Sequence, residues 1–219
     1  MSIKENLFEI KSELPKNVTL VAVSKTKPIS DLMEAYDAGQ RIFGENKIQE
    51  MTEKWESMPK DIHWHMIGHI QTNKVKFMAP YVSLIHGVDS LKLLEEINKQ
   101  AIKNNRIIDC LLQIHIAEEE TKFGLNEEEL NNLLDSESFK AMSNIRIVGL
   151  MGMATFTNNQ SQIKKEFKHL KSIFDHKKTL SIVNCQLSIL SMGMSGDYKL
   201  AIECGSSMIR IGSSIFGGR

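Results

Sequence analysis

Short apolar runs alternate along the chain with longer amphipathic segments. Runs rich in Val, Ile and Leu are typical of buried strands, and apolar residues spaced three or four apart are typical of helices. The predicted strands cover residues 18–25, 42–46, 62–68, 84–89, 107–116, 145–153, 186–191 and 207–212. The predicted helices cover residues 2–14, 30–39, 47–58, 72–82, 90–105, 126–140, 159–178 and 197–204.

This order of elements predicts an α/β protein with one parallel sheet. Strands that alternate with helices form parallel sheets, and eight such units favour a single-domain (β/α)₈ TIM barrel over residues 1–219. Only seven residues follow Gly212, too few for a closing helix, so the N-terminal helix is expected to complete the outer ring. A doubly wound open sheet is the alternative fold.

The first predicted strand ends at a lysine. Period-two alternation places Val21, Val23 and Lys25 on one face of this strand. An ammonium on the same face as two valines is costly to bury without a partner or a chemical task. Lys25 is therefore either a lysine that extends into solvent at a strand end or an amine at a barrel mouth that forms a Schiff base.

The last two predicted strands are followed by loops rich in Gly and Ser. These loops are Ser191–Ser195 and Arg210–Ser214, and on the final strand Arg210 shares a face with Met208 and Gly212. Backbone N–H groups and hydroxyls in such loops can surround an anion, and barrels often bind phosphate at this position. An amine, an inward arginine and two phosphate-binding loops together suggest a phosphorylated aldehyde, with pyridoxal phosphate the leading candidate.

Several motifs resemble those of the pyridoxal phosphate homeostasis protein family over nearly the whole chain. They are Ala22–Pro28, Phe43–Asn46, Trp64–Lys74, Ser191–Ser195 and Arg210–Gly217. The resemblance implies a barrel like the N-terminal domain of alanine racemase. It implies that Lys25 is the Schiff-base lysine, that Asn46 lies beside the cofactor ring and that Arg210 faces the pyridine nitrogen. The remaining cofactor-binding residues that it implies are Ile67, Ser191, Gly193, Met194, Ser195, Gly212 and Ser213.

Two classes of function compete for such a site. One is a protein that binds pyridoxal phosphate for vitamin B6 homeostasis and amino-acid balance without a turnover reaction, with pyridoxal-phosphate-dependent apoenzymes as candidate recipients. The other is an amino-acid racemase or related fold-type III enzyme, which needs a second acid or base on the ring face opposite the lysine. Tyr36, Tyr81 and Tyr198 are predicted on or beside helices rather than at strand ends, so the binding protein is favoured.

Composition narrows the choice of partners and location. Lys+Arg 27 equals Asp+Glu 27, so no net charge favours nucleic acid or anionic membranes. The chain contains no apolar run of the roughly 20 residues that span a bilayer and no signal-peptide pattern at its start. Three widely spaced cysteines suit a reducing compartment, so a cytoplasmic monomer is expected.

Other residues that could bind a ligand receive weaker support. The spacing of His63, His65 and His69 brings no carboxylate or cysteine to complete a ligand set, so no metal site is expected. Lys27 and Lys122 are further amines near strand ends that could play secondary roles.

Overall fold

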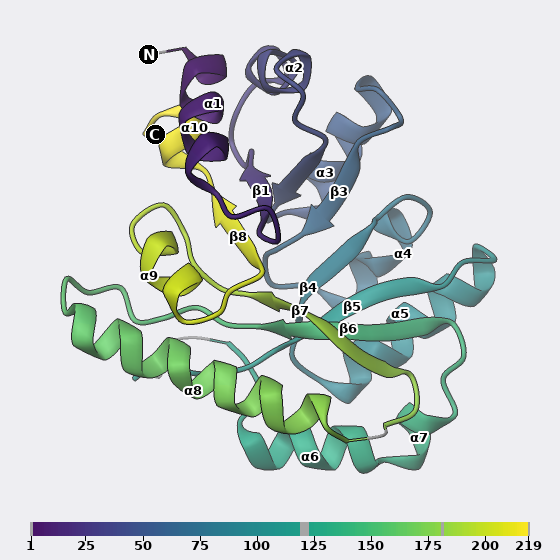
Figure 1. Cartoon of the computed structure of the whole chain (residues 1–219). Coiled ribbons are helices and arrows are strands. Elements are labelled where there is room, and N and C mark those ends of the chain that lie inside the picture. The colour runs from purple at the N-terminus through teal and green to yellow at the C-terminus, as the bar shows by residue number, and fades with distance from the viewer. Residues whose placement is uncertain (1, 119–122, 181, 219) are drawn as a thin grey trace.

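The strands close into a parallel barrel in which neighbours in sequence are neighbours in space (Figure 1). The computed structural model describes residues 2–118, 123–180 and 182–218. Its strands are β1 Thr19–Val23, β2 Ile42–Glu45, β3 His63–Met66, β4 Leu84–Val88, β5 Ile108–Gln113, β6 Ile145–Met151, β7 Cys185–Ser191 and β8 Met208–Ile211. Because β8 pairs with β1, the predicted (β/α)₈ barrel is confirmed and the open sheet is excluded.

Helices follow the strands as the sequence predicts, with three differences, one of which is the short helix α10 after β8, where none was expected. The helices are α1 Ile3–Glu13, α2 Ile29–Asp37, α3 Ile48–Ser57, η1 Thr72–Lys74, α4 Val75–Met78, α5 Leu91–Lys103, α6 Glu127–Asp135, α7 Glu137–Lys140, α8 Gln160–Lys178, α9 Tyr198–Glu203 and α10 Ser213–Phe216. The helix expected over 72–82 is reduced to η1 and the short α4. The helix expected over 126–140 is split at Ser136, because the Ser136 hydroxyl accepts a hydrogen bond from Phe139 N and starts α7.

Two apolar cores lie on opposite sides of the sheet. Inside the barrel Val21 packs in a small cluster with Met208, whereas Leu20 and Ala22 belong to the large core between strands and helices. Strand residues alternate between these cores, as period-two geometry requires. The alternation predicted for β1 and β8 is therefore confirmed, and it directs Arg210 into the barrel.

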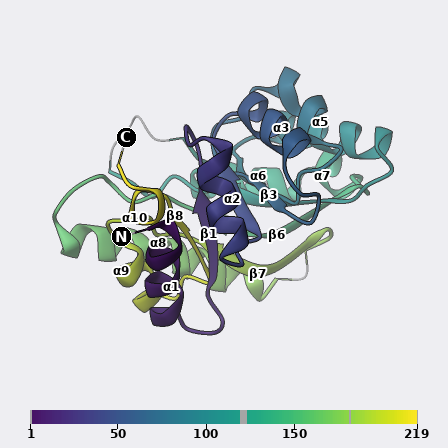
Figure 2. The same ribbon diagram turned by 90° about the horizontal axis from the view of Figure 1, so that it is seen from above.

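The N-terminal helix completes the outer ring, as expected. The Asn6 side chain donates to Ile215 O at 2.9 Å, which attaches α1 to α10. At its other end Glu13 forms an ion pair of 2.8 Å with Lys199 of α9. Both ribbon views show α1 beside α10 and close to the end of the chain (Figures 1 and 2). The helix thus stands where a helix after β8 would otherwise close the barrel.

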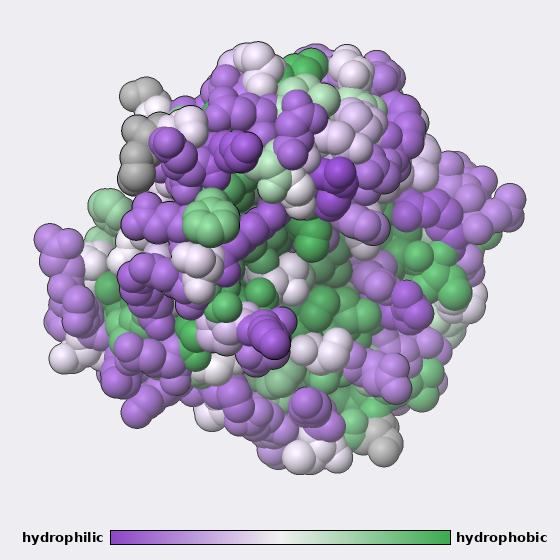
Figure 3. Space-filling model, turned by 45° about the horizontal axis from the view of Figure 1, so that its top comes forward, coloured by the Kyte–Doolittle hydropathy of each residue, from purple (hydrophilic) through white to green (hydrophobic). Residues whose placement is uncertain are grey.

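One face of the barrel is largely polar. Figure 3 shows a face that is mostly hydrophilic, with hydrophobic residues gathered in a hollow near its centre. In the described part of the chain, no helix is both long enough and apolar enough to cross a membrane.

Candidate functional site

A cleft of about 710 Å³ opens where β1 and β2 end. Lys25, two residues after β1, and Asn46, directly after β2, are both half-buried and line it. The other lining residues are Thr26, Lys27, Pro28, Asp31, Lys47, Glu50 and Gly218. In a barrel the carboxyl ends of the strands form the functional face, so the cleft lies where a site is expected.

A tight turn carries Lys25. The Lys27 N–H donates to Ser24 O at 3.1 Å, which closes the turn over Lys25 and Thr26. Thr26 has φ +64°, in the left-handed region that a β-branched residue rarely adopts. The Lys27 ammonium donates to Phe216 O and Gly218 O, each at 3.0 Å. Lys27 therefore attaches the turn to the C-terminal segment.

An ionic cluster of Glu45, Glu50 and Lys54 lies behind this turn, between the sheet and α3. The Lys54 ammonium donates to Glu45 Oε1 at 2.8 Å, to Glu50 Oε1 at 2.7 Å and to Ser24 O at 2.8 Å. The Ser24 hydroxyl donates to Glu45 Oε1 at 2.6 Å. Burial raises the pKa of Glu45, and the charge of Lys54 opposes that rise. Lys54 is therefore the cation that offsets part of the cost of burying this carboxylate.

On the other side of β1, Arg210 lies inside the barrel and is 4% exposed. Its guanidinium donates to Ser191 O at 2.9 Å, to Ser191 Oγ at 2.6 Å and to Gly152 O at 3.1 Å. Burial lowers the pKa of Arg210 to about 10, and the charge of Asp197 opposes the shift. Arg210 therefore stays charged at neutral pH, and uncharged oxygens hold it in place.

A chain of neutral groups continues from Arg210 across the barrel. Ser191 Oγ lies 3.2 Å from His86 Nδ1, and His86 Nε2 lies 3.1 Å from His65 Nδ1. Since arginine can only donate, Ser191 Oγ accepts from it, and the second lone pair and the proton of this hydroxyl remain for His86. The two contacts run in one direction along the chain, because the neutral His86 ring donates through one nitrogen and accepts through the other. Burial lowers the pKa of His65 to about 3 and that of His86 well below its usual value, in agreement with two neutral rings.

The two glycine-serine loops meet beside β1. Gly193 has φ +98°, and a Cβ there would lie 2.6 Å from the Cβ of Ala201, so this position requires glycine. Gly212 N donates to Ser195 Oγ at 3.3 Å, which joins the loops. The first N–H groups of α10, starting at the exposed Ser213, have no intrahelical acceptor. These loops offer backbone donors of the kind that bind phosphate.

The structure places the predicted site residues in three groups. Lys25 and Asn46 share the cleft. The second group consists of Ile67, Ser191 and Arg210. Ile67 is half-buried just after β3, and a Cβ added at Gly44 would lie 3.1 Å from Ile67 Cδ1. Ser191 is fully buried against Arg210. The third group consists of Gly193, Met194, Ser195, Gly212 and Ser213, in the two loops. The second and third groups do not line the cleft, and Lys122 lies outside the described residues.

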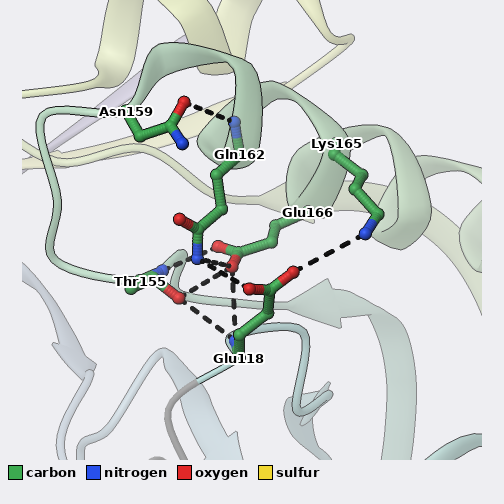
Figure 4. Close-up of polar contacts among 6 residues, drawn as sticks. All are labelled: Glu118, Thr155, Asn159, Gln162, Lys165 and Glu166. Carbon is green, nitrogen blue, oxygen red and sulfur yellow. Dashed lines mark hydrogen bonds and ion pairs between the residues drawn. The ribbon is translucent and has the colours of Figure 1, made fainter.

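Hydrogen bonds join the loops after β5 and β6 to α8 (Figure 4). The buried Glu166 carboxylate accepts from Thr155 N and Thr155 Oγ1, both at 2.7 Å, and from Glu118 N at 3.3 Å. Gln162 Nε2 donates to the same carboxylate at 3.2 Å. One side chain of α8 therefore holds two loops at the carboxyl ends of the strands.

Sequence reasoning missed three of these features: the cluster of Glu45, Glu50 and Lys54, the part played by His86, and Glu166. A signal for the first was present, because Glu45 is a charged residue on the outward face of a strand and must face a helix. His86 alternates inward on β4 as His65 does on β3, so the barrel geometry pairs them once the strands are known. Glu166 lies in a charged helix, and only the fold reveals its burial.

Comparisons with known proteins support a common family. The family model for the alanine racemase N-terminal domain matches residues 1–219. Proteins named pyridoxal phosphate homeostasis protein from Aquifex aeolicus and Haemophilus influenzae are 38% and 36% identical to the chain. The match to the first covers 91% of this chain and 86% of that protein, and the match to the second covers 100% and 97%.

Solved structures agree with these sequence matches. PipY of Synechococcus elongatus, solved with PLP bound, superposes with a TM-score of 0.89 at 32% identity, covering 99% of this chain and all of that one. Alanine racemase from E. faecalis superposes with a TM-score of 0.79 at 16% identity, and the match covers 99% of this chain but 58% of the racemase chain. The second likeness concerns the fold alone.

Proposed function

The chain belongs to the pyridoxal phosphate homeostasis protein family, and on that basis we propose that it binds pyridoxal 5′-phosphate and acts in vitamin B6 homeostasis, with an indirect effect on amino-acid balance. The observation that carries the proposal is the half-buried Lys25, which lines a cleft with Asn46 at the carboxyl ends of β1 and β2. An amine in this position, next to two glycine-serine loops, suits a ligand with an aldehyde and a phosphate.

The residues of the site fit this ligand, and each has a distinct part. Bound pyridoxal phosphate supplies an aldehyde that condenses with a primary amine and releases water, and Lys25 Nζ is the amine that we assign to it. Asn46 would border the ring and Arg210 would face its nitrogen. Close packing at Gly193, where an added Cβ would meet Ala201, supports a preformed loop for the phosphate. Ile67, Ser191, Met194, Ser195, Gly212 and Ser213 complete the proposed set.

We favour a binding protein over a racemase. The relatives above carry the name homeostasis protein rather than that of an enzyme. Two of the three tyrosines have their hydroxyls engaged outside the barrel, Tyr36 with Asp61 at 2.9 Å and Tyr81 with Thr52 at 2.9 Å. An arginine at the pyridine nitrogen disfavours its protonation, which weakens the ring as an electron sink.

The same proposal extends to the setting of the protein. We propose that residues 1–219 form one pyridoxal-phosphate-binding domain that acts as a monomer, because its barrel closes within the chain and leaves no open sheet edge to pair with another copy. The free thiols of Cys110, Cys185 and Cys204 support a reducing cytoplasm. Pyridoxal-phosphate-dependent apoenzymes are suitable recipients, since condensation with an amine is reversible.

Covalent trapping tests the binding. The protein is incubated with pyridoxal phosphate, reduced with borohydride and mapped by peptide mass spectrometry, and the label is expected on Lys25. The Lys25→Ala variant should carry no label at that peptide, whereas Lys27→Arg should be labelled as the unchanged chain is. A label found only on Lys27 or Lys122 would refute the assignment.

Proton exchange separates the binding protein from the racemase. Amino acids are incubated in deuterated water with the loaded protein, and their α-protons are followed by NMR. Little exchange is expected, and inversion at a turnover above about one per second, as ordinary enzymes show, would establish an enzyme.

A further inference from the structure

The residue after Lys25 holds an unfavourable backbone conformation. Among the described residues, the non-glycine residues with positive φ are Thr26, Asn105 and Asn184. Asparagine tolerates the left-handed region because its short polar side chain bonds locally, but threonine is β-branched and does not. A conformation of this kind persists only where surrounding contacts hold it, and it is concentrated at functional sites.

Glu50 supplies the contact that holds Thr26. The Thr26 N–H donates to Glu50 Oε1 at 2.6 Å, a short distance for a backbone donor and a carboxylate. The same oxygen accepts from Lys54 Nζ at 2.7 Å. Lys54 is 5% exposed and is in turn fixed by Glu45, which is fully buried. Glu50 therefore acts from a rigid support rather than from a mobile surface position.

The position of Glu50 on its helix supports a specific role. Glu50 is the third residue of α3, where a glutamate ordinarily accepts from the backbone of its own N-cap residue. Here Lys47 caps α3 without a side-chain hydrogen bond, and the Glu50 carboxylate is directed to Thr26 instead. α3 therefore lacks this local cap, because the Glu50 carboxylate accepts a hydrogen bond from the turn that carries Lys25.

The residue on the other side of Lys25 is attached to the same cluster. Ser24 O accepts from Lys54 Nζ at 2.8 Å, and Ser24 Oγ donates to Glu45 Oε1 at 2.6 Å. Both neighbours of Lys25 are therefore fastened to Glu45, Glu50 and Lys54, which fixes the direction in which the Lys25 side chain leaves the backbone.

We propose that Glu50 is a positioning residue for Lys25: it holds Thr26 in the left-handed conformation that directs the lysine into the cleft. This role rests on the proposed function, in which Lys25 binds the aldehyde. Without the Glu50 acceptor, Thr26 relaxes to an ordinary conformation and the turn no longer presents Lys25. Binding then has to restore the unfavourable backbone, which weakens affinity.

A set of variants of the intact chain tests this role. The variants are Glu50→Ala, Glu50→Gln, Thr26→Gly combined with Glu50→Ala, and the control Glu53→Ala, on an exposed residue of the same helix. The affinity for pyridoxal phosphate is measured by visible absorbance, and the rate of borohydride-trapped labelling at Lys25 is followed in parallel. Thermal midpoints report stability separately.

We expect Glu50→Ala to weaken affinity roughly tenfold, the size of one unfavourable backbone conformation. Glu50→Gln keeps an acceptor oxygen and should lose less. Adding Thr26→Gly to Glu50→Ala should recover most of the lost affinity, because glycine adopts positive φ without penalty. Glu53→Ala should stay within about twofold of the unchanged chain, as expected for an exposed side chain.

The outcomes separate this inference from the proposed function. If the unchanged chain takes no label at Lys25, the proposed function fails. If it is labelled but Glu50→Ala binds equally well, only the positioning role fails. A loss in Glu50→Ala that Thr26→Gly does not relieve would show that Glu50, which also lines the cleft, acts on the ligand directly and would overturn the inference.

Discussion

Two buried polar assemblies flank β1, and they are built in opposite ways. The ionic cluster of Glu45, Glu50 and Lys54 lies outside the barrel under α3 and consists of full charges. The assembly inside the barrel runs from Arg210 through neutral groups only, ending at the two histidines. The first is attached to the backbone on both sides of Lys25, whereas the second holds the side chain of Arg210.

The difference reflects what each assembly has to fix. A carboxylate can hold a backbone N–H in an unfavourable conformation because a charge-assisted hydrogen bond is strong. A cation that has to keep its charge free for a ligand is better held by carbonyl and hydroxyl oxygens, which orient it without neutralising it. Within the described part of the chain, the hydrogen-bond acceptors of Arg210 are such oxygens, from Ser191 and Gly152. The comparison predicts that the stability contributed by the outer assembly depends on the cation Lys54. The stability contributed by the inner assembly is predicted to depend on the hydroxyl of Ser191.

Removing the cation of the outer cluster should have the largest effect. In Lys54→Met, Glu45 is left fully buried without its ion-pair partner, and one of its oxygens, Oε2, already lacks a hydrogen-bond partner within the described structure. Loss of one partner of a buried pair costs about 3 kcal/mol or more, although uptake of a proton by Glu45 limits the loss. Urea unfolding at neutral pH measures the change in free energy of unfolding.

The control for this variant is a pair of the same type nearer the surface, in which the lysine is half-buried and the aspartate exposed. Lys171 and Asp175 lie four residues apart on α8, as Glu50 and Lys54 do on α3. Lys171→Met should change the free energy of unfolding by less than about 0.5 kcal/mol. Equal losses in both variants would show that burial of the outer cluster contributes nothing to stability.

Removing the hydroxyl of the inner assembly should have a smaller effect. Ser191→Ala deprives Arg210 of one acceptor and His86 of a hydrogen-bond partner, and unsatisfied buried groups of this kind cost about 1–3 kcal/mol. Since Arg210 keeps its bonds to two carbonyl oxygens, it should stay in place and affinity for pyridoxal phosphate should fall little. Unfolding and titration of the same variant measure the two quantities.

This variant also separates two roles for Ser191. Family resemblance assigns Ser191 to the phosphate, whereas its full burial against Arg210 points to support of the arginine. Loss of affinity without loss of stability would favour contact with the phosphate. Ser188→Ala, at an exposed position of the same strand, should change neither quantity.

The sequence predicted the barrel well because its signals are local and repeated. Each strand is a short apolar run, and the helix starts expected at residues 2, 90, 126 and 159 are confirmed, with Ser2, Ser90, Asn126 and Asn159 as their N-caps in the structure. The helix expected over 72–82 failed, since its apolar residues lie close to helical spacing although the chain makes only two short turns there.

The sequence points to candidate site residues only where a polar side chain breaks an apolar pattern. Lys25 and Asn46 follow apolar runs, and Arg210 interrupts the apolar run of β8. The supporting groups do not stand out in this way. Lys54 and Glu50 look like any exposed helical pair four residues apart, and only the packing of α3 against β2 buries Lys54. The pairing of His65 with His86 depends on barrel closure rather than on spacing in the sequence.

The smallest expected effect is the pH dependence that each histidine of the inner assembly contributes near neutral pH. The pKa of His65 is about 3 in the folded chain and about 6.5 when unfolded, so below pH 6.5 the unfolded state binds more protons and stability falls. Between pH 7 and 6 each buried histidine should lower the free energy of unfolding by about 0.7 kcal/mol, and by nearly 1.4 kcal/mol per unit at lower pH. Urea unfolding at pH 7, 6 and 5 measures this slope.

His65→Gln should remove one histidine's share of the slope, whereas His63→Gln, at an exposed position of the same strand, should leave it unchanged. An equal slope in His65→Gln and the unchanged chain would mean that His65 takes up protons in the folded state, which would contradict the low pKa that its burial produces.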